Sequence, residues 1–196
     1  MEFLIDNVEV FGIGNSVIAS GYPMKAETRY SGYKQSRADK LADNSPGTGH
    51  NNFLKGIIIQ ADITASIKWW VQQERYSFAD IISSQSTMHK LKDMNLDKTY
   101  IDYVDDRVIE VMKGLQEQYN ENPTKENFYK LIYTNPDGLM LTARITTNYL
   151  QEKTIYNQRR THKLDEWQKY CDWLETLPNS HWITNNGDKQ HADKGD

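Results

Sequence analysis

Apolar and polar residues alternate along two stretches of the chain, as expected for strands that bury one face. These stretches are residues 3–13, FLIDNVEVFGI, and residues 139–147, LMLTARITT. A third stretch, residues 53–64, contains three consecutive isoleucines and is typical of a buried strand. The pattern therefore predicts about three strands.

Apolar residues spaced three and four apart predict helices elsewhere. The predicted helices are residues 17–21, 37–42, 65–75, 78–82, 100–120, 128–133, 149–160 and 163–177. Residues 100–120 form the most amphipathic of them. Ser16 and Asn148 are candidate N-caps for the helices that follow them. Strands and helices do not alternate regularly, so we expect an α+β fold, a small mixed sheet packed against several helices.

A chain of 196 residues is long enough to bury a substantial core, and one domain over residues 1–180 is the default expectation. Residues 185–196 contain almost no large apolar side chain. We therefore expect residues 181–196 to form a flexible C-terminal tail.

Charge and composition exclude several classes of protein. Lysine and arginine number 23 against 27 aspartates and glutamates, so the net charge is −4 and binding to nucleic acid is not expected. No apolar run is long enough for a membrane span, and the N-terminus does not resemble a signal peptide. The single cysteine, Cys171, cannot form an intrachain disulfide. These features together lead us to expect a cytoplasmic protein. The five histidines show no metal-ligand spacing, so we expect no metal.

Three segments carry motifs in a particular order. Residues 49–64 read GHNNFLKGIIIQADIT, residues 69–86 read WWVQQERYSFADIISSQS, and residues 133–167 begin YTNPDGLMLTARITTNYL and end LDEW. In their order and intervals, these motifs resemble those of the flavin-dependent thymidylate synthases of phages and bacteria. The resemblance covers most of residues 16–177.

Several residues of this chain match the motifs of that family. In the first segment Gly49, His50 and Phe53 match. In the third segment Asn148 matches, and Arg159 follows it by the eleven residues found in the family.

The second segment departs most from the family. Arg75 lies where the last residue of an Arg-His-Arg triplet is expected, but Gln73 and Glu74 replace the first two. Residues 84–86, Ser-Gln-Ser, lie where the family has a serine, but no arginine follows them.

The resemblance implies a flavin-dependent thymidylate synthase-like fold and a one-carbon transfer to the uracil of dUMP or a related pyrimidine deoxynucleotide. FAD would be the cofactor, and NADPH and methylenetetrahydrofolate the co-substrates. It implies that Arg159 is catalytic. The implied substrate-binding residues are Arg75, Ser84, Gln85, Ser86 and Arg159, and the implied cofactor-binding residues are His50, Arg75 and Asn148. It also implies a homotetramer, in the host cytoplasm if the chain is encoded by a phage.

Most of these residues also have a structural interpretation. Arg159 could be a surface arginine like Arg160, and Arg75 a cation at the end of a helix. Serine is a frequent helix cap. Three functions therefore stay open: a methyltransferase of this family, or a related enzyme making another modified base; a non-catalytic nucleotide- or flavin-binding relative; and an unrelated helical interaction protein. The motifs favour the enzyme.

Overall fold

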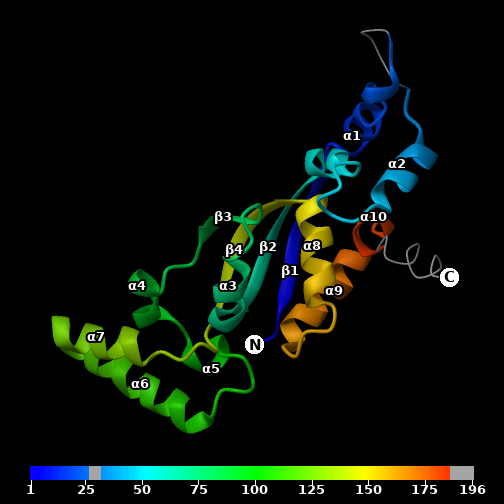
Figure 1. Ribbon diagram of the computed structural model, residues 1–196. Coiled ribbons are helices and arrows are strands. Elements are labelled where there is room, and N and C mark those ends of the chain that lie inside the picture. Colours follow the sequence, from blue (N-terminus) through cyan, green and yellow to red (C-terminus); the bar gives the residue numbers. More distant parts are fainter. Residues whose placement is uncertain (27–31, 186–196) are drawn as a thin grey trace. The chain divides into compact units, whose positions relative to one another are not determined.

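The computed structural model of the protein describes residues 1–26 and 32–185. Its sheet consists of β1 (Leu4–Phe11), β2 (Ile58–Ser66), β3 (Asp80–Ser84) and β4 (Met140–Asn148). The strands lie in the order β1-β2-β4-β3 and are antiparallel (Figure 1). The predicted α+β class is confirmed, although the sheet is antiparallel and not mixed.

Helices make up most of the remaining described chain. The α-helices are α1 (Ile13–Ala19), α2 (Gln35–Ala42), α3 (Ile67–Gln73), α4 (Thr87–Lys90), α5 (Leu96–Thr99), α6 (Asp106–Glu121), α7 (Lys125–Thr134), α8 (Tyr149–Arg159), α9 (Asp165–Glu175) and α10 (His181–Thr184). The 3-10 helices are η1 (Tyr22–Met24), η2 (Asn52–Gly56) and η3 (Leu91–Asp93). Among the helices described, none is long and apolar enough to cross a membrane.

The chain divides into two compact units. Unit 1 comprises residues 1–6, 62–75 and 81–145, and unit 2 comprises residues 7–61, 76–80 and 146–196. The single domain over residues 1–180 stays a prediction. Of the expected tail, His181–Thr184 form α10 with Trp182 and Ile183 buried, and residues 186–196 lie outside the described residues.

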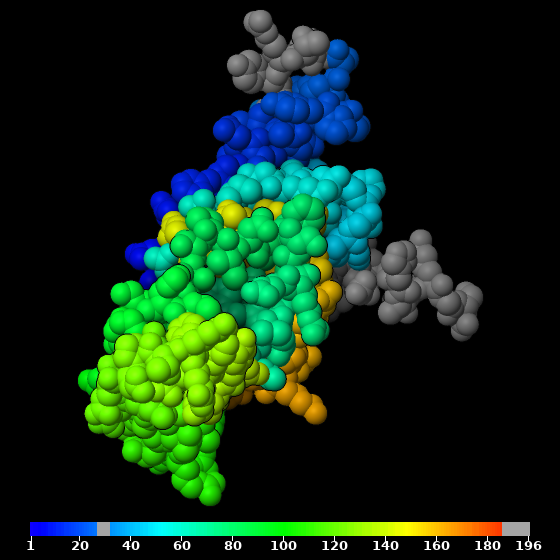
Figure 2. Space-filling model, turned by 90° about the vertical axis from the view of Figure 1, so that its left-hand side faces the viewer, coloured from blue at the N-terminus to red at the C-terminus, as the bar shows by residue number. Residues whose placement is uncertain are grey.

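Unit 1 is built around a core of apolar side chains from α6, α7, the segment before α6 and the residue that precedes β4. Its buried members are Leu91, Leu96, Tyr100, Met112, Leu131 and Leu139. Helices α6 and α7 form an antiparallel hairpin, and Figure 2 shows α7 in yellow-green on the face turned to the viewer. Asp105 caps α6 and Thr124 caps α7 through side-chain hydrogen bonds to backbone N–H groups.

Unit 2 packs α8 against α9, α10 and η2. A fully buried lysine joins three of its elements. Lys153 on α8 donates hydrogen bonds of 2.6 Å to the carbonyl oxygens of Ala42, at the end of α2, and of Asn185, just after α10. Burial lowers the pKa of Lys153. The ammonium satisfies two carbonyls that helix ends leave without intrahelical partners.

A close backbone approach in unit 2 requires a glycine at position 12. Gly12 caps α1 with a φ of 83°, and a Cβ built on it would lie 2.4 Å from the carbonyl oxygen of Gly56. A Cβ on Gly56 would lie 2.5 Å from Oγ of Ser16. Glycine is therefore needed where α1 meets η2.

The helix predicted over residues 78–82 is wrong, because Asp80–Ser84 form strand β3. Two consecutive β-branched residues, Ile81 and Ile82, favour the extended chain. Beyond the strand, the backbone N–H of Gln85 donates to the Thr142 carbonyl at 3.0 Å, and Gln85 Oε1 accepts from the Thr142 N–H at 2.9 Å. Pairing to β4 therefore decides the conformation.

Two predicted helix starts also differ. Helix α1 begins at Ile13, so Ser16 lies inside the helix and is not its cap. The helix expected from residue 100 begins at Asp106, because Tyr100 forms a β-bridge with Leu139. In contrast, Asn148 caps α8 as predicted.

Candidate active site

The guanidinium of Arg159, on the last turn of α8, lies against two aromatic rings of unit 2. Its Nε donates a 2.7 Å hydrogen bond to Oη of Tyr76. Its Cζ lies 4.7 Å from the ring centre of Trp167 and 5.6 Å from that of Tyr76. Tyr76 is 9% exposed and Trp167 is fully buried, whereas Arg159 is half-buried. A cation over ring faces that exclude water is stabilised by the ring quadrupoles.

A second hydrogen bond fixes the tyrosine of this group. Oη of Tyr76 donates to Oε1 of Gln158 at 3.1 Å, while it accepts from Arg159. The rings of Tyr76 and Trp167 meet edge to face, with centres 6.1 Å apart. We call Tyr76, Gln158, Arg159 and Trp167 the Arg159 cluster.

The Arg159 cluster provides a positive charge in a fixed place. His162 lies near it, with its ring centre 6.4 Å from that of Trp167. Burial lowers the pKa of His162, and the charge of Arg159 lowers it further. Near neutral pH the guanidinium is therefore the cation of this group, which suits a ligand that carries or develops negative charge.

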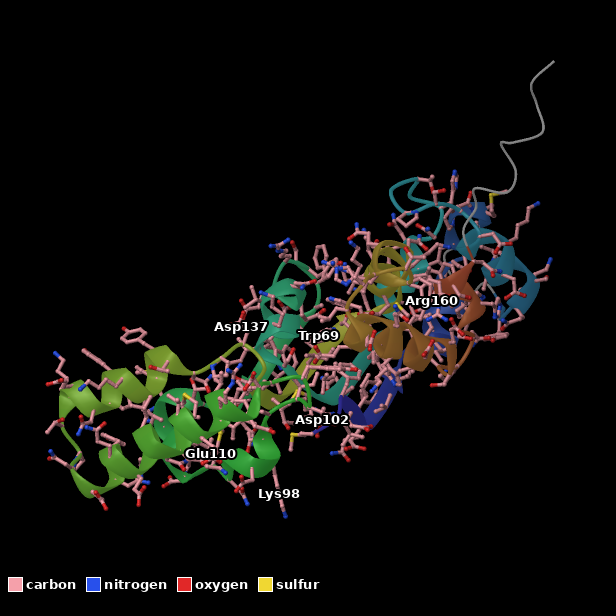
Figure 3. The ribbon with its side chains drawn as sticks, turned by 90° about the horizontal axis from the view of Figure 1, so that it is seen from below. Trp69, Lys98, Asp102, Glu110, Asp137 and Arg160 are labelled. Carbon is pink, nitrogen blue, oxygen red and sulfur yellow. The ribbon has the colours of Figure 1, made fainter. Side chains whose placement is uncertain are left out.

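Arg160, the next residue, has a different environment. It forms ion pairs with Asp172 at 2.6 Å and with Glu175 at 3.4 Å, both from α9 (Figure 3 labels Arg160). The hydrogen bond to Asp172 raises the pKa of Arg160. This arginine fastens α8 to α9, so the two adjacent arginines are not equivalent.

Asn148 and Arg159 mark opposite ends of α8. Oδ1 of Asn148 accepts a 3.0 Å hydrogen bond from the N–H of Gln151, as an N-cap does. Eleven residues of α-helix span about 16 Å. The structure therefore does not bring these two predicted site residues together, and a ligand touching both would have to extend along the helix.

A buried carboxyl group lies two turns before Arg159 on α8. Glu152 is fully buried and accepts hydrogen bonds from the hydroxyls of Thr147 at 2.7 Å and Tyr170 at 2.9 Å. Burial raises its pKa to about 7, and the two hydroxyls oppose this shift. Tyr170 also contacts Trp167 edge to face, with ring centres 5.7 Å apart. Tyr170 therefore connects the Glu152 carboxyl group to Trp167, a member of the Arg159 cluster.

The other predicted substrate-binding residues belong to unit 1. Arg75 follows the end of α3 and is exposed. Ser84 ends β3 and is exposed, and Ser86 is the N-cap residue of α4, although its side chain makes no capping hydrogen bond. Gln85 between them pairs with Thr142, as described above, so its amide has a structural role.

His50 is exposed in a turn of unit 2, directly after Gly49, whose φ is 80°. The next residue, Asn51, is fully buried, and its Nδ2 donates to the Asn44 carbonyl at 2.7 Å. Its Oδ1 has no hydrogen-bond partner among the described residues. The turn therefore presents the imidazole outward and turns an amide inward.

Gln73, at the end of α3, is the most unusual polar residue of unit 1. Its side chain is fully buried, and within the described part of the chain neither Oε1 nor Nε2 has a hydrogen-bond partner. Burying an amide without partners costs free energy, so native proteins seldom do it. Gln73 also lies at the position of the first arginine in the Arg-His-Arg motif that this segment resembles.

Two further groups bear on the chemistry. Across residues 1–26 and 32–185, no three His, Cys, Asp or Glu side chains gather as metal ligands would. Cys171 is buried, and burial raises the pKa of its thiol to about 12. A protonated, enclosed thiol is not an effective nucleophile.

Several of the features around the predicted site could not be identified from the sequence. Arg159 was predicted, but its partner Tyr76 lies 83 residues earlier in the chain. Glu152 and Tyr170 were not singled out. The one signal for Tyr76 is its position directly after Arg75, inside the second motif.

The fold is that of the flavin-dependent thymidylate synthases, as the motifs led us to expect. No protein-family profile matches the chain, and no curated protein matches it in sequence. The similarity is therefore one of structure at low sequence identity.

Two similar solved structures are both of thymidylate synthase X from Helicobacter pylori. One, with FAD and dUMP at 2.31 Å resolution, has a TM-score of 0.71 at 15% identity and matches 97% of this chain and 100% of its own. The other, a flavin-dependent thymidylate synthase complexed with FAD and dUMP, has a TM-score of 0.67 at 16% identity, over 94% of this chain and 97% of its own.

Proposed function

We propose that this protein is a flavin-dependent enzyme that transfers a one-carbon unit to the uracil ring of dUMP or a related pyrimidine deoxynucleotide. The observation that carries the proposal is the Arg159 cluster. An arginine at the motif spacing is held between Tyr76 and Trp167, on a fold shared with enzymes crystallised with FAD and dUMP.

Arg159 would act on the pyrimidine. When uracil is activated for substitution at C5, negative charge gathers on its carbonyl oxygens. A guanidinium fixed beside a buried indole can stabilise that charge, because its orientation is set before the reaction begins. In the net reaction a C5–C bond forms and the C5 proton leaves. Both bonds from the transferred carbon to the folate nitrogens break, the two nitrogens take up protons, and a hydride that comes from NADPH would complete the methyl group.

The remaining predicted residues would bind the ligands. Arg75, Ser84 and Ser86 offer a cation and two hydroxyls suited to a phosphate, and Gln85 lies between the serines. His50, Arg75 and Asn148 would hold FAD. When bound, FAD supplies hydride transfer from NADPH, with methylenetetrahydrofolate as the source of carbon. Cys171 takes no part, because its thiol is buried and protonated.

The amide of Gln73 fits a ring ligand of this kind. It has one acceptor and one donor group, which is the pattern complementary to the imide edge shared by uracil and flavin. A buried amide without a partner is a group that such a ligand would satisfy. An arginine there would instead carry charge, so the replacement suits recognition of a neutral ring edge.

The same replacement supports a second candidate function. Gln73 and Glu74 remove two cationic groups that the family triplet provides. A relative with this change could bind nucleotide or flavin without catalysis, or could make a different 5-substituted pyrimidine. The product of the reaction distinguishes these candidates from a thymidylate synthase.

The proposal is tested on the purified protein. We expect flavin absorbance near about 450 nm, a general property of flavins, either as isolated or after addition of FAD and removal of the excess. We also expect NADPH oxidation that requires both dUMP and methylenetetrahydrofolate, with a product about 14 mass units heavier than dUMP. A protein that binds neither FAD nor dUMP contradicts the proposal, and binding without turnover supports the non-catalytic alternative.

Assembly and location belong to the same proposal. We infer a homotetramer, and a place in the cytoplasm of the cell, or of a phage host. Sedimentation should give four times the 22.8 kDa mass of one chain. A single species with the mass of one chain rules out the tetramer.

A further inference from the structure

Tyr76 orients Arg159 through a directional hydrogen bond. Trp167 supplies a ring face, and attraction between a cation and a ring face is only weakly directional, so the guanidinium could turn in its plane. The hydrogen bond from Nε to Oη of Tyr76 restricts this freedom, because it joins one particular edge of the guanidinium to one atom at 2.7 Å.

The hydroxyl of Tyr76 is itself held in place. Its proton is directed to Oε1 of Gln158 at 3.1 Å, which leaves an oxygen lone pair for Arg159. The ring is 9% exposed and meets Trp167 edge to face. A phenylalanine would fill the same space but would offer Arg159 no acceptor.

The position of Tyr76 in the chain is also informative. It directly follows Arg75, which we propose binds nucleotide or flavin, and its hydroxyl reaches α8 across 83 residues of sequence. The second motif therefore supplies both a ligand-binding cation and the acceptor that orients another arginine.

We propose that Tyr76 is a positioning residue, whose hydroxyl holds the guanidinium of Arg159 in the orientation that binds the pyrimidine nucleotide. The inference rests on the proposed function, because it takes dUMP as the ligand. Tyr76 acts through Arg159 and need not contact the nucleotide.

The test compares three variants of the full chain with the wild type. Tyr76→Phe removes the hydroxyl and keeps the ring. Tyr156→Phe is the matched control: it removes a tyrosine hydroxyl from α8 that bonds Glu175 at 2.8 Å and not Arg159. Arg159→Lys keeps the charge but not the planar group. Binding of dUMP is measured by calorimetry, and the Nε–H signal of Arg159 by nuclear magnetic resonance on protein with nitrogen-15-labelled arginine.

We expect Tyr76→Phe to weaken dUMP binding about tenfold, as the loss of one oriented hydrogen bond predicts. Arg159→Lys should weaken it at least as much, and Tyr156→Phe should bind like the wild type. The slowly exchanging Nε–H signal of Arg159 should disappear in Tyr76→Phe and persist in Tyr156→Phe. This signal does not depend on nucleotide and would not change if Tyr76 only packed the core.

The outcomes separate the two proposals. If the wild type binds dUMP, Arg159→Lys weakens it and Tyr76→Phe does not, the positioning role is wrong and the proposed function stands. If the Nε–H signal persists in Tyr76→Phe, the orienting hydrogen bond is absent and the inference fails. If the wild type binds neither dUMP nor FAD, the proposed function fails and the positioning role fails with it.

Discussion

Glu152 links the stability of unit 2 to pH. Its carboxyl group is fully buried, and burial raises its pKa to about 7 from 4.5. Between these values the unfolded chain has released the proton and the folded chain retains it. The unfolding free energy contributed by this residue therefore falls as pH rises from about 4.5 to 7, by on the order of 3 kcal/mol.

We expect Glu152→Gln to remove this dependence, because the amide does not titrate and can still accept and donate hydrogen bonds. The variant should resemble the wild type near pH 5 and be more stable than it near pH 8. Urea unfolding at both pH values measures the difference, with Glu117→Gln as a control that makes the same charge change at an exposed position. If the unfolding free energies of Glu152→Gln and the wild type differ by the same amount at both pH values, the pKa of Glu152 is not raised in the folded protein.

Replacing Gln73 by an apolar residue should stabilise the protein. Its buried amide has no partner among the described residues, so Gln73→Met should raise the unfolding free energy by about 1–3 kcal/mol. If Gln73 contacts a ring ligand, the same variant should bind that ligand more weakly. Thermal unfolding without ligand and calorimetry with FAD and with dUMP measure the two effects.

Gln116→Met is the matched control for Gln73→Met. Nε2 of Gln116 donates to the carbonyls of Leu91 at 2.8 Å and Met94 at 2.9 Å. The same substitution should therefore lower the stability of unit 1 by about 1–3 kcal/mol, since two partly buried carbonyl acceptors lose their donor. Equal effects at both positions contradict the account of Gln73.

At the scale of residues, the sequence predicts which side chains carry charge but not their partners. Arg159 and Arg160 are adjacent and chemically identical, yet one lies against Trp167 and the other pairs with Asp172. Helix geometry turns consecutive side chains through about 100°, and the sequence does not say what packs on each side. The partner Tyr76 comes from a distant segment and could be found only from the fold.

At the scale of elements, the junction of α1 and η2 depends on Gly12. An alanine there must adopt a φ of 83° and place its Cβ 2.4 Å from a backbone oxygen. We expect Gly12→Ala to destabilise the protein by about 3 kcal/mol or more. Gly14→Ala is the control: its Cβ would meet nothing within 4 Å inside α1, so it should stabilise by up to about 1 kcal/mol. Equal melting temperatures of Gly12→Ala and Gly14→Ala would show that the backbone contact between residues 12 and 56 does not require glycine at position 12.

The elements that the sequence predicted well are those with sustained periodicity. Residues 139–147 alternate clearly and correspond to β4, and the cap Asn148 lies where expected. The run 78–82 failed because five residues do not distinguish a helix turn from a strand. Its conformation follows from pairing with β4, which no local pattern reports.

At the scale of the whole molecule, the fold was easier to predict than the ligand chemistry. The fold depends on many apolar positions, so a solved structure can share it at 15% sequence identity. Ligand chemistry depends on a few charged side chains, and Gln73 and Glu74 stand where the motif that the sequence resembles has two cations. Arg159 is the cation whose surroundings can now be described, and its effect should be measurable in the stability of the entire protein.

Nucleotide binding should therefore raise the melting temperature, and the two adjacent arginines should differ in this effect. At a concentration one hundred times its Kd, dUMP should stabilise the folded protein by about 2.7 kcal/mol. For a chain of this length that corresponds to an increase in melting temperature of about 5–10 °C.

Arg159→Ala should lose most of this increase at the same dUMP concentration. Arg160→Ala breaks the ion pairs to Asp172 and Glu175, so it should lower the melting temperature without ligand yet keep the dUMP-induced increase. If dUMP raises the melting temperature of both variants equally, Arg159 does not contribute to dUMP binding. A lost contact would weaken binding, and weaker binding stabilises the folded protein less at the same dUMP concentration.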